Sequence, residues 1–272
     1  MRKFTVLFFI LVSLSSFAQE VISDLVSNPV LADYKHKINP FKSTLSLPFI
    51  DDFSYDSHQV DNDLWMESSV FVNRTYPINP PTIGVATFDG LDANGFARDF
   101  SPSTSSEPSD TLLSQTIDLS GISSAYFMFY YQAQGNGNDP QITDSLILEF
   151  YSGTDSLGDA IWNTVWEKEG STFHEFKKVV YIFTDPEYLT LDFSFRFRNL
   201  ASVTGNFDHW NIDYVKLDEY HNSSDTSFLN DVAFVRNTPH ILKRYREMPW
   251  IHFVNDMTQE INDSLDIILR NN

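Results

Sequence analysis

The segment from Leu189 to Leu217 constrains the fold most, because its first part alternates apolar and polar residues with the period of a β-strand. Every second residue of 189–197 is Leu or Phe, and the residues between are Thr, Asp, Ser and Arg. Successive side chains of a strand point to opposite faces, so the pattern predicts a strand with one buried face. A polar loop leads to a second strand over 210–217, with one face formed by Trp210, Ile212, Tyr214 and Lys216. We expect the two strands to be neighbours in one buried sheet.

Short strand patterns separated by turn residues recur before and after this segment. Residues 125–132 are almost continuously apolar and predict a central strand covered on both faces. The run of Ser, Thr, Pro and acid over 101–110 predicts an exposed loop. We expect roughly nine to eleven short strands and no helix before residue 220, the pattern of an all-β, antiparallel sandwich. A parallel α/β fold would need helices between the strands.

The N-terminus has the pattern of a secretory signal peptide: Arg2 and Lys3, an apolar run to Leu14, and small residues before Gln19. We expect residues 1–18 to be removed by the export machinery, leaving 19–44 as an N-terminal arm. The apolar run is short for a bilayer span, so we expect no stable membrane insertion. The protein is then secreted, passing through the periplasm to the extracellular space or the cell surface.

Composition shifts after residue 220. We expect the sandwich to occupy 45–220, a linker 221–227, and the beginning of a second, incomplete β domain 228–272. A helical turn or two is expected within 238–250. The final alternating segment, 264–270, predicts a strand that has no partner in this chain.

The charge balance narrows the class of partner. The chain has 37 acidic and 18 basic residues, and such a surface repels phosphate backbones, so we expect no nucleic-acid partner. The acidic surface either favours the binding of divalent cations or simply keeps a secreted protein soluble. The chain has no cysteine, which points to a bacterial rather than an animal secreted protein and removes thiol catalysis.

Catalytic motifs are missing from the sequence. The run from Gly121 to Ala125 fails the nucleophile-elbow pattern, and His174-Glu175 lacks the second His of a zinc-protease motif. His209 beside Asp208 is either a proton-transfer pair or a polar loop histidine. We therefore predict no catalytic residue.

Taken in order, LPFIDDFSY, VFVN, PPTIGVATFDGLD, SAYFMFYYQAQG, DSLILEFY, FRFRN and FDHWNIDYVKL resemble the N-terminal jelly-roll domain, MAM-like or cleaved-adhesin-like, of large secreted Bacteroidota proteins of the type IX secretion kind. The resemblance covers about residues 45–220. It implies a jelly-roll sandwich in which an Asp of the closing strand helps to hold the first strand and a structural calcium ion. In such domains the first strand, an early turn and the last strand converge at one edge. The positions that match carry oxygen ligands: Asp51, Asp52, Asp89 and Asp213, with Asp92, Asn94 and Asp208 further out. The alternative is that these acids accept hydrogen bonds from nearby backbone without an ion.

Two other residue classes bear on function. Sugar rings stack on exposed aromatic faces, although a Trp side chain more often packs in the core. Four tryptophans are therefore candidates for ligand binding: Trp65, Trp162, Trp166 and Trp210. Four Asp-Ser/Thr-Leu triplets match the acceptor pattern of O-glycosylation in the phylum whose proteins the chain resembles. The alternative is that they are ordinary turns entering strands. The candidate hydroxyls are those of Thr111, Ser145, Ser156 and Ser264.

These features predict a non-catalytic, adhesin-like module of a secreted or cell-surface bacterial protein that binds a glycan or a surface protein. One alternative is an accessory N-terminal domain of a secreted hydrolase whose catalytic domain lies elsewhere. Another is a component of the secretion or gliding apparatus.

Overall fold

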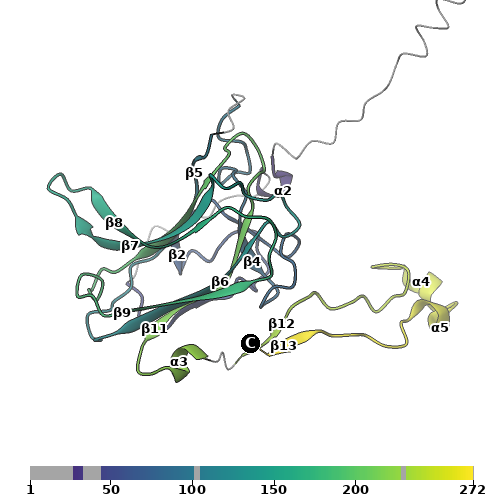
Figure 1. Ribbon diagram of the computed structural model, residues 1–272. Helices are drawn as coiled ribbons and strands as arrows, with labels where there is room; N and C mark the ends of the chain where they lie inside the picture. The colour runs from purple at the N-terminus through teal and green to yellow at the C-terminus, as the bar shows by residue number, and fades with distance from the viewer. Residues whose placement is uncertain (1–26, 33–43, 101–104, 228–230, 272) are drawn as a thin grey trace, which may run out of the picture.

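The computed structural model describes residues 27–32, 44–100, 105–227 and 231–271. The predicted signal peptide and most of the predicted N-terminal arm lie outside these residues. A single helical turn, α2 (Pro29–Ala32), precedes the first strand. The rest of the chain up to residue 220 is strand and loop, and two antiparallel sheets face each other (Figure 1).

One sheet has six strands in the order β3-β4-β11-β6-β9, and β1 also pairs with β11. Its strands are β1 (Phe49–Asp51), β3 (Phe71–Asn73), β4 (Val85–Phe88), β6 (Ala125–Ala133), β9 (Lys177–Phe183) and β11 (Trp210–Glu219). The other sheet has the order β2-β5-β10-β7-β8, with β2 (Trp65–Ser68), β5 (Glu107–Ser114), β7 (Ser145–Thr154), β8 (Ala160–Glu169) and β10 (Phe195–Ala201). The prediction of an all-β antiparallel jelly-roll sandwich is confirmed.

The core between the sheets is aromatic. Phe127 of β6 contacts Phe195 edge to face, with ring centroids 4.6 Å apart, and Phe49 packs against both Phe195 and Trp65. Such pairs add about 0.5–1.5 kcal/mol each beyond the area that they bury. Residues 125–133 are buried on both faces except for a half-buried Tyr130, as predicted for a central strand.

The predicted pairing of the two strands in 189–217 is wrong. β10 spans Phe195–Ala201 rather than 189–197, and Leu191 before it is 61% exposed. β10 and β11 also lie in different sheets, so the loop between them crosses the sandwich instead of forming a hairpin. Alternation identified the buried face of β10 but not the sheet to which it belongs.

The predicted faces of β11 are correct only for its first half. Trp210 and Ile212 are in the core, but a bulge follows, and Tyr214 has a φ of 52°. One extra residue reverses the side-chain parity. Val215 and Leu217 therefore enter the core, whereas Tyr214 lies on the other face of the sheet with Tyr126 and Met128.

The same bulge marks a change of partner along one edge of β11. Residues 210–212 pair with β4, and residues 215–217 pair with β1. The chain just after β1 passes so close to the start of β4 that a Cβ on Gly84 would lie 1.8 Å from the Phe53 carbonyl oxygen. Only glycine fits there. β1 and β4 thus meet end to end along a single strand.

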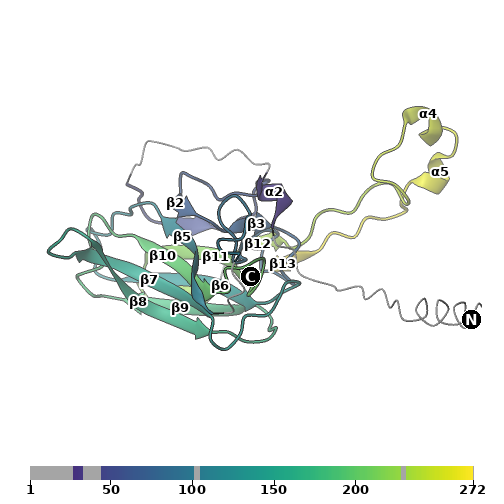
Figure 2. The same ribbon diagram turned by 90° about the horizontal axis from the view of Figure 1, so that it is seen from above.

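The region after the sandwich is different in kind. A helical turn, α3 (Ser224–Ser227), leads towards an extended ribbon of residues 231–271, hereafter the C-terminal arm, which projects away from the sheets (Figure 2). β12 (Val232–Phe234) pairs with β13 (Leu269–Asn271), so the prediction of an unpaired final strand is wrong. The helical turns lie at α4 (Trp250–Phe253) and α5 (Met257–Glu260), later than expected.

The loop predicted over 101–110 ends earlier than expected, because β5 begins at Glu107. Among the residues that the structure describes, no helix is long and apolar enough to cross a membrane.

Candidate functional site

A ladder of polar side chains crosses four neighbouring strands at one end of the six-stranded sheet. Asn73 of β3 donates to Thr87 Oγ1 of β4 (2.7 Å), and Thr87 donates to Asn211 Oδ1 of β11 (2.6 Å). Gln132 of β6 is the residue opposite Asn211. Thr87, Asn211 and Gln132 are fully buried, and hydrogen bonds such as that from Thr87 to Asn211 offset the cost of burying polar groups.

The residues that cover this ladder belong to the loop 76–81. Gln132 makes two hydrogen bonds to the backbone of Ile78 in this loop: its Oε1 accepts from Ile78 N (3.0 Å) and its Nε2 donates to Ile78 O (2.8 Å). Asn73 Oδ1 accepts from Tyr76 N (2.9 Å). Three prolines restrict the loop further, since each fixes its φ near −65°. The loop is therefore rigid, and two pockets border it.

The first is a pocket of about 300 Å³, hereafter the amide pocket, half of whose lining residues carry amide side chains: Tyr76, Gln134, Asn136, Gly137, Asn138, Asp139, Asn206 and His209. Tyr76 lies over His209 with ring centroids 4.7 Å apart, and its hydroxyl accepts from Asn206 Nδ2 (2.8 Å). Glycine is required at position 137 beside the His209 ring, because a Cβ on Gly137 would lie 2.4 Å from His209 Cγ.

His209 is locked in one neutral state. Asn138 N donates to its Nδ1 (2.9 Å), so we assign the proton to Nε2, which donates to Asn206 Oδ1 (2.7 Å). Burial lowers the pKa of His209 to about 4. An imidazole with both nitrogens engaged and a pKa this low is a scaffold for the pocket. It does not pair with Asp208, whose carboxylate accepts instead from Ser202 N (2.8 Å).

Asp139 is the carboxylate of the amide pocket. It is half-buried and has no hydrogen bond or ion pair within the part of the chain that the structure describes. The amides around it carry both donors and acceptors. The pocket thus presents mixed hydrogen-bonding groups beside an aromatic ring, which suits a ligand rich in hydroxyl groups.

The acids predicted to meet at a calcium ion lie in separate places. Asp51 accepts from Trp65 Nε1 (2.6 Å) and from Phe53 N (2.9 Å). Burial raises the pKa of Asp51 to about 6. Asp213 accepts from Thr82 N (2.8 Å) and Thr82 Oγ1 (2.9 Å) at the junction of β1 and β4. Donors thus occupy the positions that a cation would need.

The remaining predicted ligands are similarly engaged. Asp89 is buried beside Asp110, to which Arg98 donates (3.0 Å), and burial together with Asp110 raises the pKa of Asp89 well above its usual value. Asp92 shapes its own turn by accepting from Asn94 N and Phe96 N. The outer carboxylate, Asp208, has a pKa near 7 because of burial and the nearby Asp144.

Within the described ranges, no three acidic or histidine side chains gather to hold a metal ion. Asp52 does lie close enough to Asp213 to raise its pKa, but Asp89 is not part of that site. The structure does not bring Asp52, Asp89 and Asp213 into one group, and calcium binding stays a prediction. In the described residues these acids accept hydrogen bonds from backbone at strand ends and turns.

The four tryptophans divide into two classes. Trp65 and Trp210 are fully buried in the core, so neither presents a ring face on which a ligand could stack. Trp166 is partly buried against Phe129. Trp162 is half-exposed on the outer face of the five-stranded sheet, where the Arg196 guanidinium lies 4.3 Å from its ring centroid. Of the predicted ligand tryptophans, Trp162 alone combines exposure with a position away from the core.

The face around Trp162 carries an ion-pair network. Glu149 of β7 accepts from Arg196 Nε (2.6 Å) and Arg198 Nη2 (2.9 Å) of β10. Despite burial, the two guanidinium groups lower the pKa of Glu149. Most of the charged donors are thus already paired, which leaves this face less open to a new ligand than the amide pocket.

The predicted O-glycosylation positions differ in exposure. Ser145 is 3% exposed within β7, so its hydroxyl cannot be reached in the folded chain, and Thr111 is half-buried in β5. Ser156 lies in the exposed turn between β7 and β8, and Ser264 is exposed in the C-terminal arm. O-glycosylation of Ser156 and Ser264 stays a prediction.

Sequence reasoning missed the amide pocket because its residues come from three distant loops. The signals were present: three prolines in 76–81 and the run from Gln134 to Asp139, which we predicted only as a polar loop. A pattern within one segment cannot show that these loops are brought together by Asn73, Thr87 and Gln132.

No family model matches the sequence, and no curated protein matches it. Among solved structures, it is similar to the K1 cleaved adhesin domain of Lys-gingipain from Porphyromonas gingivalis (11% identity, TM-score 0.35, 64% of this chain and 99% of that chain). It is also similar to a xylan-binding domain from Paenibacillus barcinonensis (10%, TM-score 0.37, 66% and 99%). A Family 16 carbohydrate-binding module matches at 11% and 0.32, covering 57% and 90%. Likeness at this level carries no inference about what this chain binds.

Proposed function

We propose that the sandwich is a non-catalytic binding module that takes a segment of neutral glycan in the amide pocket. The observation that carries the proposal is the pocket's lining, in which amides surround one unpaired carboxylate, Asp139, beside the Tyr76 ring. Vicinal sugar hydroxyls each donate and accept, so they match side chains that do both.

The rigidity of the pocket supports the same function. Its walls are fixed before a ligand arrives, because Gln132 holds the loop 76–81 and Asn206 holds both Tyr76 and His209. A preformed site loses little conformational entropy when it binds. Glycans offer few apolar contacts, so a site for them gains most from such preorganisation.

The chemistry of His209 argues for binding rather than catalysis at this pocket. General base catalysis works best with a pKa near the working pH and a free nitrogen. His209 has neither, since burial holds its pKa near 4 and both nitrogens are hydrogen-bonded. An accessory role beside a separate catalytic domain fits the same site.

The test is a screen of neutral oligosaccharides followed by calorimetric titration of the full chain. Asp139→Ala is expected to weaken binding by about tenfold or more, since a hydrogen bond to a charged group is worth about 1.5–3 kcal/mol. Asp159→Ala is the matched control, because it removes the same group from an exposed turn of the other sheet. Absence of glycan binding, or equal binding by Asp139→Ala, would overturn the proposal.

A further inference from the structure

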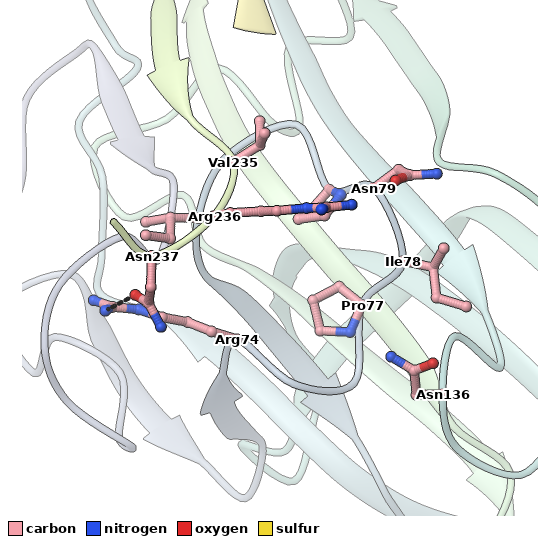
Figure 3. A pocket seen from close by; sticks show the side chains of 10 residues that line it. Arg74, Pro77, Ile78, Asn79, Asn136, Val235, Arg236 and Asn237 are labelled. Carbon is pink, nitrogen blue, oxygen red and sulfur yellow. Dashed lines mark hydrogen bonds between the residues drawn. The ribbon is translucent and has the colours of Figure 1, made fainter. Parts of the chain in front are cut away.

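A second pocket, hereafter the arginine cleft, also borders the loop 76–81 (Figure 3). It has a volume of about 310 Å³ and is bounded by this loop and by residues 235–237 of the C-terminal arm. Pro77, Pro80 and Ile83 supply apolar lining, whereas Arg74, Arg236 and Asn237 supply polar lining.

The arginines at this cleft have no carboxylate partner. Arg74 donates to Asn237 Oδ1 (2.9 Å) and to Ser54 O (3.2 Å), which are neutral oxygens. Arg236 makes no hydrogen bond or ion pair in the described ranges, and its side chain extends across the cleft towards Asn79 (Figure 3). An adjoining groove adds Arg270, which donates to Asn79 O (2.9 Å), although Glu175 also lines that groove.

This arrangement stands out in a chain with 37 acidic and 18 basic residues. Of the other described arginines, Arg98, Arg196, Arg198 and Arg244 form ion pairs with carboxylates, whereas Arg246 of the C-terminal arm forms no ion pair in the described ranges. Among the described arginines of the sandwich, Arg74 at the arginine cleft is thus the exception to charge pairing. The positive charge left there is available to an anion from outside.

We infer that the arginine cleft binds the anionic group of an acidic glycan, a uronic acid carboxylate or a sulfate ester. This inference rests on the proposed function, because neighbouring neutral sugars would occupy the amide pocket. Asn136 lines both pockets, so a single chain of sugars can pass from one to the other around the loop.

The chemistry of the lining fits this ligand class. A guanidinium group presents parallel N–H donors that match a carboxylate or sulfate. The proline rings offer apolar surface to the face of a sugar. Beyond about 8 Å, salt at physiological strength screens the repulsion from the acidic surface, so a glycan with sparse charges is tolerated while a dense polyanion is disfavoured.

The experiment compares three probes on the full chain by calorimetry: a galacturonate trisaccharide, its methyl ester and a sulfated galactose oligosaccharide. At least one acidic probe is expected to bind about tenfold more tightly than the ester, and the stronger of the two identifies carboxylate or sulfate as the preferred group. Arg236→Gln should reduce this preference to within about twofold and leave the affinity for the ester unchanged. Lys168→Gln, which removes one positive charge from β8 in the other sheet, should keep the preference.

The outcomes separate the two proposals. If the ester binds as well as both acids, or if Arg236→Gln keeps the preference, the arginine cleft is not an anion site and the amide pocket stands. A different outcome overturns the amide pocket and leaves the arginine cleft standing. In that outcome Arg236→Gln abolishes the preference for the acidic probe, whereas Asp139→Ala changes neither this preference nor the affinity for the ester. If none of the three probes binds, both are overturned for these ligands.

Discussion

Most aromatic and aliphatic side chains of the sandwich are buried at least in part, whereas most of those in the C-terminal arm are exposed. Phe195 and Trp210 are completely buried, but Trp250 is 70% exposed and Ile251 is 68% exposed. The arm contributes no residue to the buried hydrophobic core of the described chain. Apolar residues alone therefore do not make a core.

The difference lies in what each strand pairs with. Each sheet of the sandwich has at least five strands and a second sheet opposite it. β12 and β13 form an isolated pair with no second layer, and a two-stranded hairpin is marginally stable in water. The predicted second β domain over 228–272 stays a prediction, and the apolar surface of the arm is what such a domain would need to cover.

The largest effect expected from this contrast is on stability. Phe195→Ala should lower the free energy of unfolding by about 3–5 kcal/mol, because it leaves a cavity where four aromatic rings meet the Phe195 ring. Trp250→Ala in the arm should change it by no more than about 0.5 kcal/mol. Urea denaturation measures both, and a comparable loss for Trp250→Ala would show that the arm is packed in solution.

A smaller effect is expected at the junction of β1 and β4. Asp213→Leu leaves the buried Thr82 N–H without an acceptor, while the Thr82 hydroxyl keeps the Asp52 carbonyl oxygen, and should cost about 1–3 kcal/mol. Asp266→Leu in the exposed arm should cost little. Melting of the wild type in calcium and in chelator checks the metal hypothesis with the same samples. We expect equal melting temperatures, since donors already occupy Asp213, and a rise in calcium would point to ligands other than these side chains.

A third effect, spread over a range of pH, comes from Asp51. Burial raises the pKa of this carboxyl from 3.8 to about 6 in the folded chain, so the folded state holds its proton more tightly than the unfolded state. Its contribution to stability is full below about pH 4 and is lost as the pH rises through about 6. The difference in unfolding free energy between wild type and Asp51→Asn should therefore fall over this range. Asp266→Asn should give a flat difference, and a flat profile for Asp51→Asn as well would contradict the raised pKa.

Much of the fold could be predicted from the sequence because burial of one strand face leaves a period of two. Phe193, Phe195 and Phe197 were assigned to the core, and all three are buried. The strand ends and partners could not be predicted, because alternation is the same in either sheet. The bulge at Tyr214 also left no local signal, so the second half of β11 was assigned to the wrong face.

The candidate site was less accessible to sequence reasoning. Asp51 and Asp213 were rightly singled out as acids inside apolar strands, but their role depends on donors that are distant along the chain, Trp65 and Thr82. Carboxylates in a strand predict a partner without saying whether it is an ion or an N–H group. Arg236 carried no pattern at all, since only the fold brings it to the loop 76–81.

The end-to-end meeting of β1 and β4 along β11 has a consequence for folding kinetics. β11 is the last strand of the sandwich in sequence, yet it is the neighbour of β1, the first. Contacts between segments so far apart form late, because closing the intervening loop costs entropy before any contact is gained. The sandwich cannot be completed until residue 217 has emerged during synthesis. A nascent chain shorter than this presents an open sheet edge on β6, which makes the unfinished domain a natural client for chaperones.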